Sequence, residues 1–180
     1  DGYYDDAVEK IGDHKAAGPL RGGKYSLFEA GTRVPFIAYW EGKIKPRVSD
    51  AMVCQMDLLP SLAELAGADA GAVDGQNLLA AFMGESDAGR EQLIIEATSR
   101  TALRRGDWIM IPPYDGPAIM KEVQIEPANG KDYQLYNLSE DLAQQKNLAA
   151  ENPEKLAEML AAFEAVRGKD YGDTKQIKLE

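Results

Sequence analysis

A lysine on a glycine-rich loop is the strongest candidate for chemistry in this 180-residue sequence. Lys24 ends a string that fits the G-x-x-x-x-G-K pattern of phosphate-binding loops: Gly18-Pro19-Leu20-Arg21-Gly22-Gly23-Lys24. A nucleotide-binding loop also needs a hydrophobic strand before it and a Ser or Thr after the lysine to hold Mg²⁺. Here Tyr25 follows the lysine, Pro19 removes one backbone N–H, and residues 11–17 lack the pattern of a strand. The sequence therefore disfavours a nucleotide loop and leaves Lys24 as a cation for another kind of anion.

The charge distribution favours an anion site in the same region. The net charge of −10 disfavours binding of nucleic acid or of an anionic membrane by the whole surface. Residues 14–33 nevertheless hold one acid, Glu29, against four cations: Lys15, Arg21, Lys24 and Arg33. We expect Glu29 and Arg33 to form a structural ion pair, which leaves the other cations for a ligand.

Two further residues have reactive side chains. His14 is the only histidine. It is either an ordinary loop residue or a substrate contact and proton donor, for which its near-neutral pKa is suited. Cys54 is the only cysteine and lies in the apolar stretch 51–56, so we expect a buried small hydrophobe rather than a nucleophile.

The hydrophobic pattern predicts an α/β or α+β chain. Residues 34–40 are a continuous apolar run, typical of a strand buried on both faces, and few other segments here are suitable neighbours for it. We expect a helix at 58–67 with an apolar stripe of Leu58, Leu62 and Leu65, and a shorter helix near 77–83. Four short strands are expected at 93–97, 101–104, 107–111 and 133–137. Pro153 marks the start of a last helix whose apolar stripe is Leu156, Met159, Leu160, Phe163 and Val166.

These elements suggest two domains. Residues 1–92 would carry the glycine loop, the buried strand and the first helices, and residues 93–180 would form a small antiparallel sheet packed by the terminal helix. No stretch approaches the roughly 20 apolar residues that a membrane helix needs, so no membrane partner is expected.

The longer string from Gly18 to Pro35 resembles the sulfatase signature G-P-L-R-G-G-K-x-x-x-x-E-G-G-x-R-V-P. The resemblance continues, in the family's order, through Asp57-Leu58-Leu59-Pro60-Ser61-Leu62, Ala102-Leu103-Arg104-x-Gly106-Asp107-Trp108 and Tyr133-x-Leu135-Tyr136-Asn137-Leu138. Among the small departures, Ala30 replaces the first glycine of E-G-G, which raises a question about the backbone near Glu29.

This resemblance implies the C-terminal portion of an arylsulfatase A-like enzyme with the alkaline phosphatase-like fold. The implied activity is hydrolysis of sulfate esters, in which Lys24 reaches the sulfate and His14 and Arg21 belong to the substrate pocket. The family's nucleophile is a formylglycine made in a C/S-x-P-x-R motif, which these 180 residues do not contain. The family's Ca²⁺ ligands would lie upstream of Asp1, and no metal ligand is expected in this chain. The resemblance thus implies an active parent enzyme and an inactive isolated chain.

The expected partners are a sulfate-ester small molecule or glycan and the missing N-terminal part of the same enzyme. Many relatives are periplasmic or secreted, which is the only indication of localisation. Two alternatives remain open: a non-catalytic folded fragment or anion-binding module, and a phosphatase or phosphonate hydrolase of the same superfamily.

Overall fold

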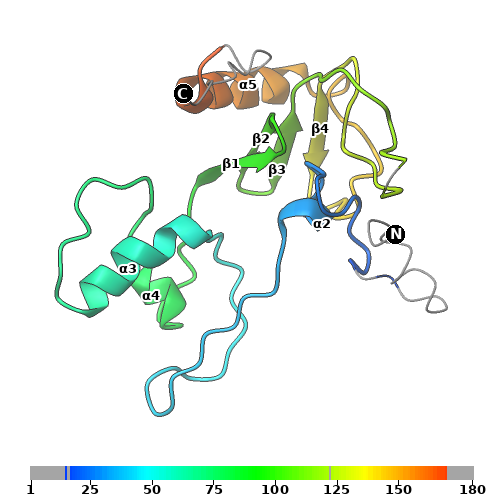
Figure 1. The fold of residues 1–180 in the computed structure, drawn as a ribbon. Helices are drawn as coiled ribbons and strands as arrows, with labels where there is room; N and C mark the ends of the chain where they lie inside the picture. Colours follow the sequence, from blue (N-terminus) through cyan, green and yellow to red (C-terminus); the bar gives the residue numbers. More distant parts are fainter. Residues whose placement is uncertain (1–14, 16, 122, 170–180) are drawn as a thin grey trace, which may run out of the picture. The chain divides into compact units, whose positions relative to one another are not determined.

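The computed structural model describes residues 15, 17–121 and 123–169, and the chain divides into two compact units (Figure 1). We call Asp1–Val34 with Gln92–Glu180 the sheet unit, and Pro35–Glu91 the helical unit. The domain division expected at residues 92 and 93 stays a prediction.

The sheet unit is built on a four-stranded antiparallel meander in the order β1-β2-β3-β4. Only two residues separate β2 from β3, and Gly106, the first of them, has a φ of 55°, which glycine adopts without strain. The strands are β1 (Gln92–Ala97), β2 (Arg100–Arg105), β3 (Trp108–Ile111) and β4 (Gln134–Asn137).

Both faces of the sheet are covered because its strands alternate two sets of apolar side chains. On one face, Leu103, Met110 and Leu135 pack against Met159 and Phe163 of α5 (Pro153–Arg167), which covers the sheet in Figure 1. The opposite face carries a second buried cluster that includes Ile95, Ala102, Ile109, Ile111 and Tyr136.

The segment after Lys24 completes this second cluster. Leu27 and Phe28 are buried, and the Phe28 ring meets Tyr136 edge-on with centroids 6.0 Å apart. A short helix, α2 (Glu29–Thr32), follows directly within a region that the sequence predicts as loop. The glycine loop is therefore anchored at its C-terminal end by apolar burial under the sheet.

The helical unit is organised around a buried ion pair. It contains η1 (Gln55–Asp57), α3 (Leu58–Leu65) and α4 (Leu79–Phe82). Arg90 donates from Nε to both carboxylate oxygens of Asp57 at 2.9 Å and from Nη2 to Oδ1 at 2.5 Å. The same carboxylate accepts the backbone N–H groups of Cys54 and Gln76. One side chain thus ties the start of α3 to two distant loops.

These bonds also set the pKa of Asp57. Burial raises it, but the hydrogen bonds from Arg90, Gln76 and Cys54 lower it by more, and the result is about 2 against an ordinary 3.8. Because the folded pKa is depressed, the ionised carboxylate stabilises the fold fully above pH 3.8, and this contribution disappears as the pH falls through about 2.

The predicted buried strand at 34–40 is wrong for the described chain. These residues form neither a helix nor a strand, and Val34, Phe36, Ile37, Tyr39 and Trp40 are between 44 and 88% exposed. Among the described residues beyond Arg33, none forms a backbone hydrogen bond with residues 34–39. A strand that is apolar on both faces forms only between neighbouring strands, and the described residues supply none.

Other expectations fare better. The α/β (α+β) fold class is confirmed, with a small antiparallel sheet packed by a C-terminal helix as predicted. The helix at α3 is present, but Leu62 and Leu65 are exposed, and the side chain it buries is Ser61, whose Oγ accepts the Leu78 N–H at 2.8 Å. None of the helices in the described part of the chain has the length and apolar character needed to cross a bilayer.

We expect Asp57→Asn to lower the free energy of unfolding of this chain by about 3–5 kcal/mol, because it leaves the buried Arg90 charge without its partner. Chemical denaturation at neutral pH measures the change. The matched control is Asp87→Asn, which breaks an ion pair with Arg47 whose acid is 65% exposed and should cost less than about 1 kcal/mol. Equal losses in the two variants would contradict a central role for Asp57.

Candidate functional site

Lys24 lies in a tight turn of the sheet unit. The Ser26 N–H donates to the Gly23 carbonyl at 2.9 Å, which closes a four-residue turn across Lys24 and Tyr25. Tyr25 has a φ of 79° whereas Lys24 has no positive φ, and this combination is that of a type II turn. The lysine side chain is exposed, its ammonium lies 5.1 Å from the centroid of the Tyr25 ring, and no described acid forms an ion pair with it. The turn therefore presents a positive charge that the described residues do not neutralise.

The glycines beside Lys24 are required by close packing. A Cβ at Gly22, whose φ is 85°, would lie 2.4 Å from the Ser26 hydroxyl. A Cβ at Gly31 would lie 2.1 Å from the Ser26 carbonyl oxygen. The turn is thus folded back tightly against the start of α2, and larger residues at these positions would displace it.

Tyr25 is strained in this turn. The third position of a type II turn favours glycine or asparagine, and another residue at positive φ costs about 1–3 kcal/mol. Such a conformation persists only where the surroundings fix it. Its carbonyl accepts a hydrogen bond from Arg100 Nη2 at 2.8 Å, from the beginning of β2.

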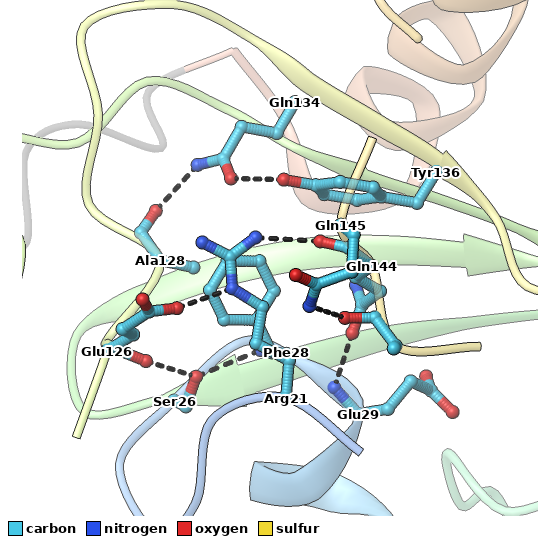
Figure 2. Close-up of polar contacts among 11 residues, drawn as sticks. Arg21, Ser26, Phe28, Glu29, Glu126, Ala128, Gln134, Tyr136, Gln144 and Gln145 are labelled. Atoms are coloured by element: carbon cyan, nitrogen blue, oxygen red, sulfur yellow. Dashed lines mark hydrogen bonds and ion pairs between the residues drawn. The ribbon is translucent and has the colours of Figure 1, made fainter. Parts of the chain in front are cut away.

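Ser26, the next residue, is fully buried and ties the turn to a second loop (Figure 2). Its hydroxyl donates to the Glu126 carbonyl at 2.6 Å and accepts the Phe28 N–H at 3.1 Å. The Leu27 N–H also reaches the Pro127 carbonyl at 3.4 Å. The loop of residues 126–129 therefore forms a wall against which the lysine turn is held.

Arg21 points into this internal network (Figure 2). Its Nε pairs with the Glu126 carboxylate, its Nη1 donates to the Gln144 carbonyl at 2.7 Å, and its guanidinium lies 4.2 Å from the centroid of the Phe28 ring. Several of its N–H groups thus already support the fold. Its predicted contact with substrate stays a prediction.

Glu29 forms the predicted pair with Arg33, at 2.8 Å from Arg33 Nε, and also binds Arg104 of β2 at 3.1 Å. The carboxylate is 1% exposed, so its charge is balanced by two arginines in a buried setting. The Glu29 N–H donates to Gln144 Oε1 at 2.8 Å. Glu29 Oε1 and Gln144 Nε2 are buried without a hydrogen-bond partner among the described residues. This cluster fixes α2 to the sheet.

The departure at Ala30 is accommodated. Ala30 lies within α2, has no positive φ, and donates its N–H to the Arg21 carbonyl at 3.0 Å. An alanine is compatible with helical backbone, so the replacement of glycine does not disturb the path at Glu29.

The other predicted reactive residues are not part of this turn. His14 lies outside the described residues, and its predicted role stays a prediction. Cys54 is half-buried in the helical unit, where burial raises the pKa of its thiol, as suits a structural cysteine better than a nucleophile.

Sequence reasoning missed three residues that hold the site together. Arg100 and Gln144 belong to no motif, and nothing in the pattern around them marks their contacts. Arg104 lies in the A-L-R-x-G-D-W string that carries part of the resemblance. The string does not indicate that Arg104 binds Glu29.

No group of three or more His, Cys, Asp or Glu within 15, 17–121 and 123–169 is placed to hold a metal ion. The described residues do not fit the Ca²⁺ site that the sulfatase resemblance implies, so none of them is assigned a role toward that ion.

Comparison with known proteins identifies the family. Residues 3–68 match the family model described as Sulfatase. The chain is 38% identical over 171 residues to an N-acetylgalactosamine-6-O-sulfatase of Bacteroides thetaiotaomicron, covering 93% of this chain and 34% of that protein. It is 40% identical over 79 residues to human arylsulfatase A, covering 43% of this chain and 16% of that protein. The chain thus spans about a third or less of the length of these relatives.

The fold agrees with the sequence. A solved structure from work on glycosaminoglycan metabolism by Bacteroides thetaiotaomicron superposes with a TM-score of 0.84 at 36% identity, covering 92% of this chain and 35% of that one. A Pseudoalteromonas sulfatase, at 20% identity, shares the fold with a TM-score of 0.65, covering 82% of this chain and 32% of that one. In sequence and in fold, this chain belongs to the sulfatase family.

Proposed function

We propose that the protein to which this chain belongs hydrolyses sulfate esters, and that the chain contributes Lys24 to the sulfate site. The observation that carries the proposal is the exposed ammonium on a turn locked by the sheet, within the string that resembles the sulfatase signature. A charge-assisted hydrogen bond from an ammonium to an anionic oxygen contributes about 1.5–3 kcal/mol. Since negative charge grows on the sulfuryl oxygens and the leaving group, a fixed cation also lowers the barrier.

The remaining chemistry is proposed to come from outside the described residues. His14 is proposed as the proton donor to the leaving oxygen or as a pocket contact, which a near-neutral pKa would allow. The 180 residues contain no C/S-x-P-x-R motif, so the formylglycine nucleophile would be supplied by another part of the protein, as would the Ca²⁺ ligands. In this division, the isolated chain binds but does not turn over a sulfate ester.

The substrate class follows from the relatives only as a proposal. The chain aligns over 93% of its length with an enzyme named N-acetylgalactosamine-6-O-sulfatase. We therefore take a 6-O-sulfated amino sugar of a glycan as the first substrate to test, beside a nitrophenyl sulfate. Nitrophenyl phosphate is the third substrate, and its hydrolysis in preference to the sulfates would indicate the alternative function of a phosphatase.

The partner of the helical unit is proposed to be the missing N-terminal part of the same enzyme. The apolar run 34–40 is exposed, and its residues 36–39 line a cavity of about 580 Å³ together with Ile44, Val48, Val53 and Phe82. A contiguous set of exposed apolar side chains is typical of a surface that another part of the protein covers. The sulfatase relative of which this chain spans 34% has ample chain to supply that cover.

We expect Lys24→Ala in the full-length protein to lower kcat/KM for a sulfate ester about tenfold or more, equivalent to about 1.4 kcal/mol, because a transition-state contact is lost. Steady-state kinetics on the aryl and amino-sugar sulfates provides the measurement. Lys131→Ala, at another exposed lysine of the sheet unit, should keep wild-type kinetics. Unchanged kinetics of Lys24→Ala would sink the assigned role.

The isolated 180-residue chain should release no product from any of these esters, even with added Ca²⁺, because it lacks the motif for the nucleophile. A discontinuous product assay with long incubation measures this. The full-length protein under identical conditions is the positive control, and turnover by the isolated chain would show that these 180 residues hold a nucleophile of their own.

The docking of the helical unit predicts a mutation whose effect depends on chain length. Ile37 is 88% exposed here, so Ile37→Asp should leave the unfolding midpoint of the isolated chain nearly unchanged. In the full-length protein the same charge would be buried without a partner, and the melting temperature should fall by several degrees. Val166→Asp, at an exposed position of α5, is the control that should be mild in both. A mild effect of Ile37→Asp in both proteins would exclude the proposed contact.

A further inference from the structure

Arg100 makes five hydrogen bonds to three separate segments around the lysine turn. Its Nη2 donates to the Tyr25 carbonyl at 2.8 Å, and its Nη1 donates to the Pro127 carbonyl at 2.8 Å and to Asn129 Oδ1 at 2.6 Å. Its Nε and Nη2 each reach Thr98 Oγ1 at 3.3 Å. A guanidinium has five N–H groups in a rigid fork, and here every one of them is directed at an acceptor.

Two of the four hydrogen-bond partners of Arg100, and a residue between the other two, have an uncommon backbone conformation. Only five described residues other than glycine have a positive φ. Tyr25 at 79° and Thr98 at 61° bond directly to Arg100, and Ala128 at 71° lies between Pro127 and Asn129, the other two partners. For a β-branched residue such as Thr98 this conformation is a real outlier. Strained residues of this kind gather at functional sites and persist where neighbouring contacts hold them.

The charge of Arg100 is not neutralised by its partners. All four acceptors are neutral oxygens, from two carbonyls, an amide and a hydroxyl. No acid of the described residues forms an ion pair with it, in contrast to Arg21, Arg33, Arg90 and Arg104. Burial lowers the pKa of its guanidinium, opposed by Tyr114, yet an arginine remains charged at neutral pH. A purely structural brace would be less costly with a carboxylate partner or with a neutral side chain.

We propose that Arg100 is a positioning residue for the sulfate site, which locks the Tyr25 carbonyl and so fixes the direction in which the turn presents Lys24. The inference rests on the proposed function of Lys24 and adds a residue 76 positions away in sequence. Among the described residues, the hydrogen bonds at the centre of the turn are the Ser26-to-Gly23 bond and the bond from Arg100 to the Tyr25 carbonyl. Without Arg100, the strained Tyr25 is free to relax and to carry the ammonium away from the sulfuryl oxygens.

A double-variant experiment in the full-length protein tests this. Arg100→Met should lower kcat for a sulfate ester severalfold, up to the loss seen in Lys24→Ala, with a smaller change in KM, as expected when a catalytic cation is misplaced. If Arg100 acts through Lys24, Lys24→Ala with Arg100→Met should fall within about twofold of Lys24→Ala alone. Additive losses in the double variant, or wild-type kcat for Arg100→Met, would overturn the proposal.

Two further variants separate positioning from a general loss of structure. Tyr25→Gly removes the strain at positive φ, so added to Arg100→Met it should recover a measurable part of kcat, which a general folding defect would not allow. Arg100→Lys keeps the charge but not the fork, and should be intermediate. If Arg100→Met does not fold, as seen from its melting temperature, Arg100→Lys takes its place in the same comparisons. An Arg100→Lys enzyme with wild-type kcat would overturn the proposal, as would a failure of Tyr25→Gly to recover activity in either background.

The matched control is Arg105→Met at the other end of β2, where the arginine pairs with Glu158 of α5 at 3.7 Å. This variant should retain wild-type kcat. The outcomes also distinguish the two proposals. Full activity of Lys24→Ala would overturn the function of the lysine and its positioning together, whereas a large loss in Lys24→Ala with no coupling to Arg100 would overturn only the inference drawn from Arg100.

Discussion

The buried carboxylate of Glu29 is the interaction on which the position of the lysine turn depends. It is 1% exposed and receives hydrogen bonds from Arg33 on its own segment and from Arg104 on β2. A charge in such a place is tolerated only when it is paired, and removing one partner of a buried pair costs far more than the pair itself contributes. The ion pair therefore acts less as a source of stability than as a constraint. Because the Glu29 carboxylate must stay paired with its arginines, α2 is held at one position on the sheet.

This constraint reaches Lys24 because the lysine is only a few residues before Glu29 in the sequence. Leu27 and Phe28 lie under the sheet immediately before Glu29, and Ser26 is buried just before them. Four consecutive residues are thus fixed by burial and hydrogen bonds, and Lys24 and Tyr25 of the turn come directly before them in the chain. The lysine side chain itself is exposed and flexible, so the position of its ammonium depends mainly on the backbone that bears it. A cation that must meet a small anion loses less entropy on binding when its backbone is already fixed.

Much of the sheet unit could be predicted from sequence because its signals are local. The strands follow alternating apolar residues, Gly106 marks a turn, and Pro153 marks the beginning of α5. The run 34–40 does not form the expected strand because an apolar segment needs neighbours to cover it, and the described residues do not supply them, as the shortage of suitable segments in the sequence indicated. The stripe at Leu62 and Leu65 fails for the same reason. Pattern alone does not distinguish a core within the chain from a surface that awaits a partner.

The candidate site shows the same division between local and distant causes. Lys24 and its glycines are contiguous, so a motif of eighteen residues was enough to single them out, and the required absence of a Cβ at Gly22 and Gly31 explains why the string is so restricted. Arg100 and the loop of residues 126–129 contact the turn, and Gln144 contacts Arg21 beside it, from positions 75 to 123 residues away, and no local pattern reports such contacts. Lys24 and Arg100 differ in the chemistry of their side chains.

The flexible ammonium of Lys24 is suited to a mobile anion, whereas the rigid guanidinium fork of Arg100 is suited to holding several carbonyl groups at fixed distances. Exchanging the two would leave the net charge unchanged and remove the property that each position needs.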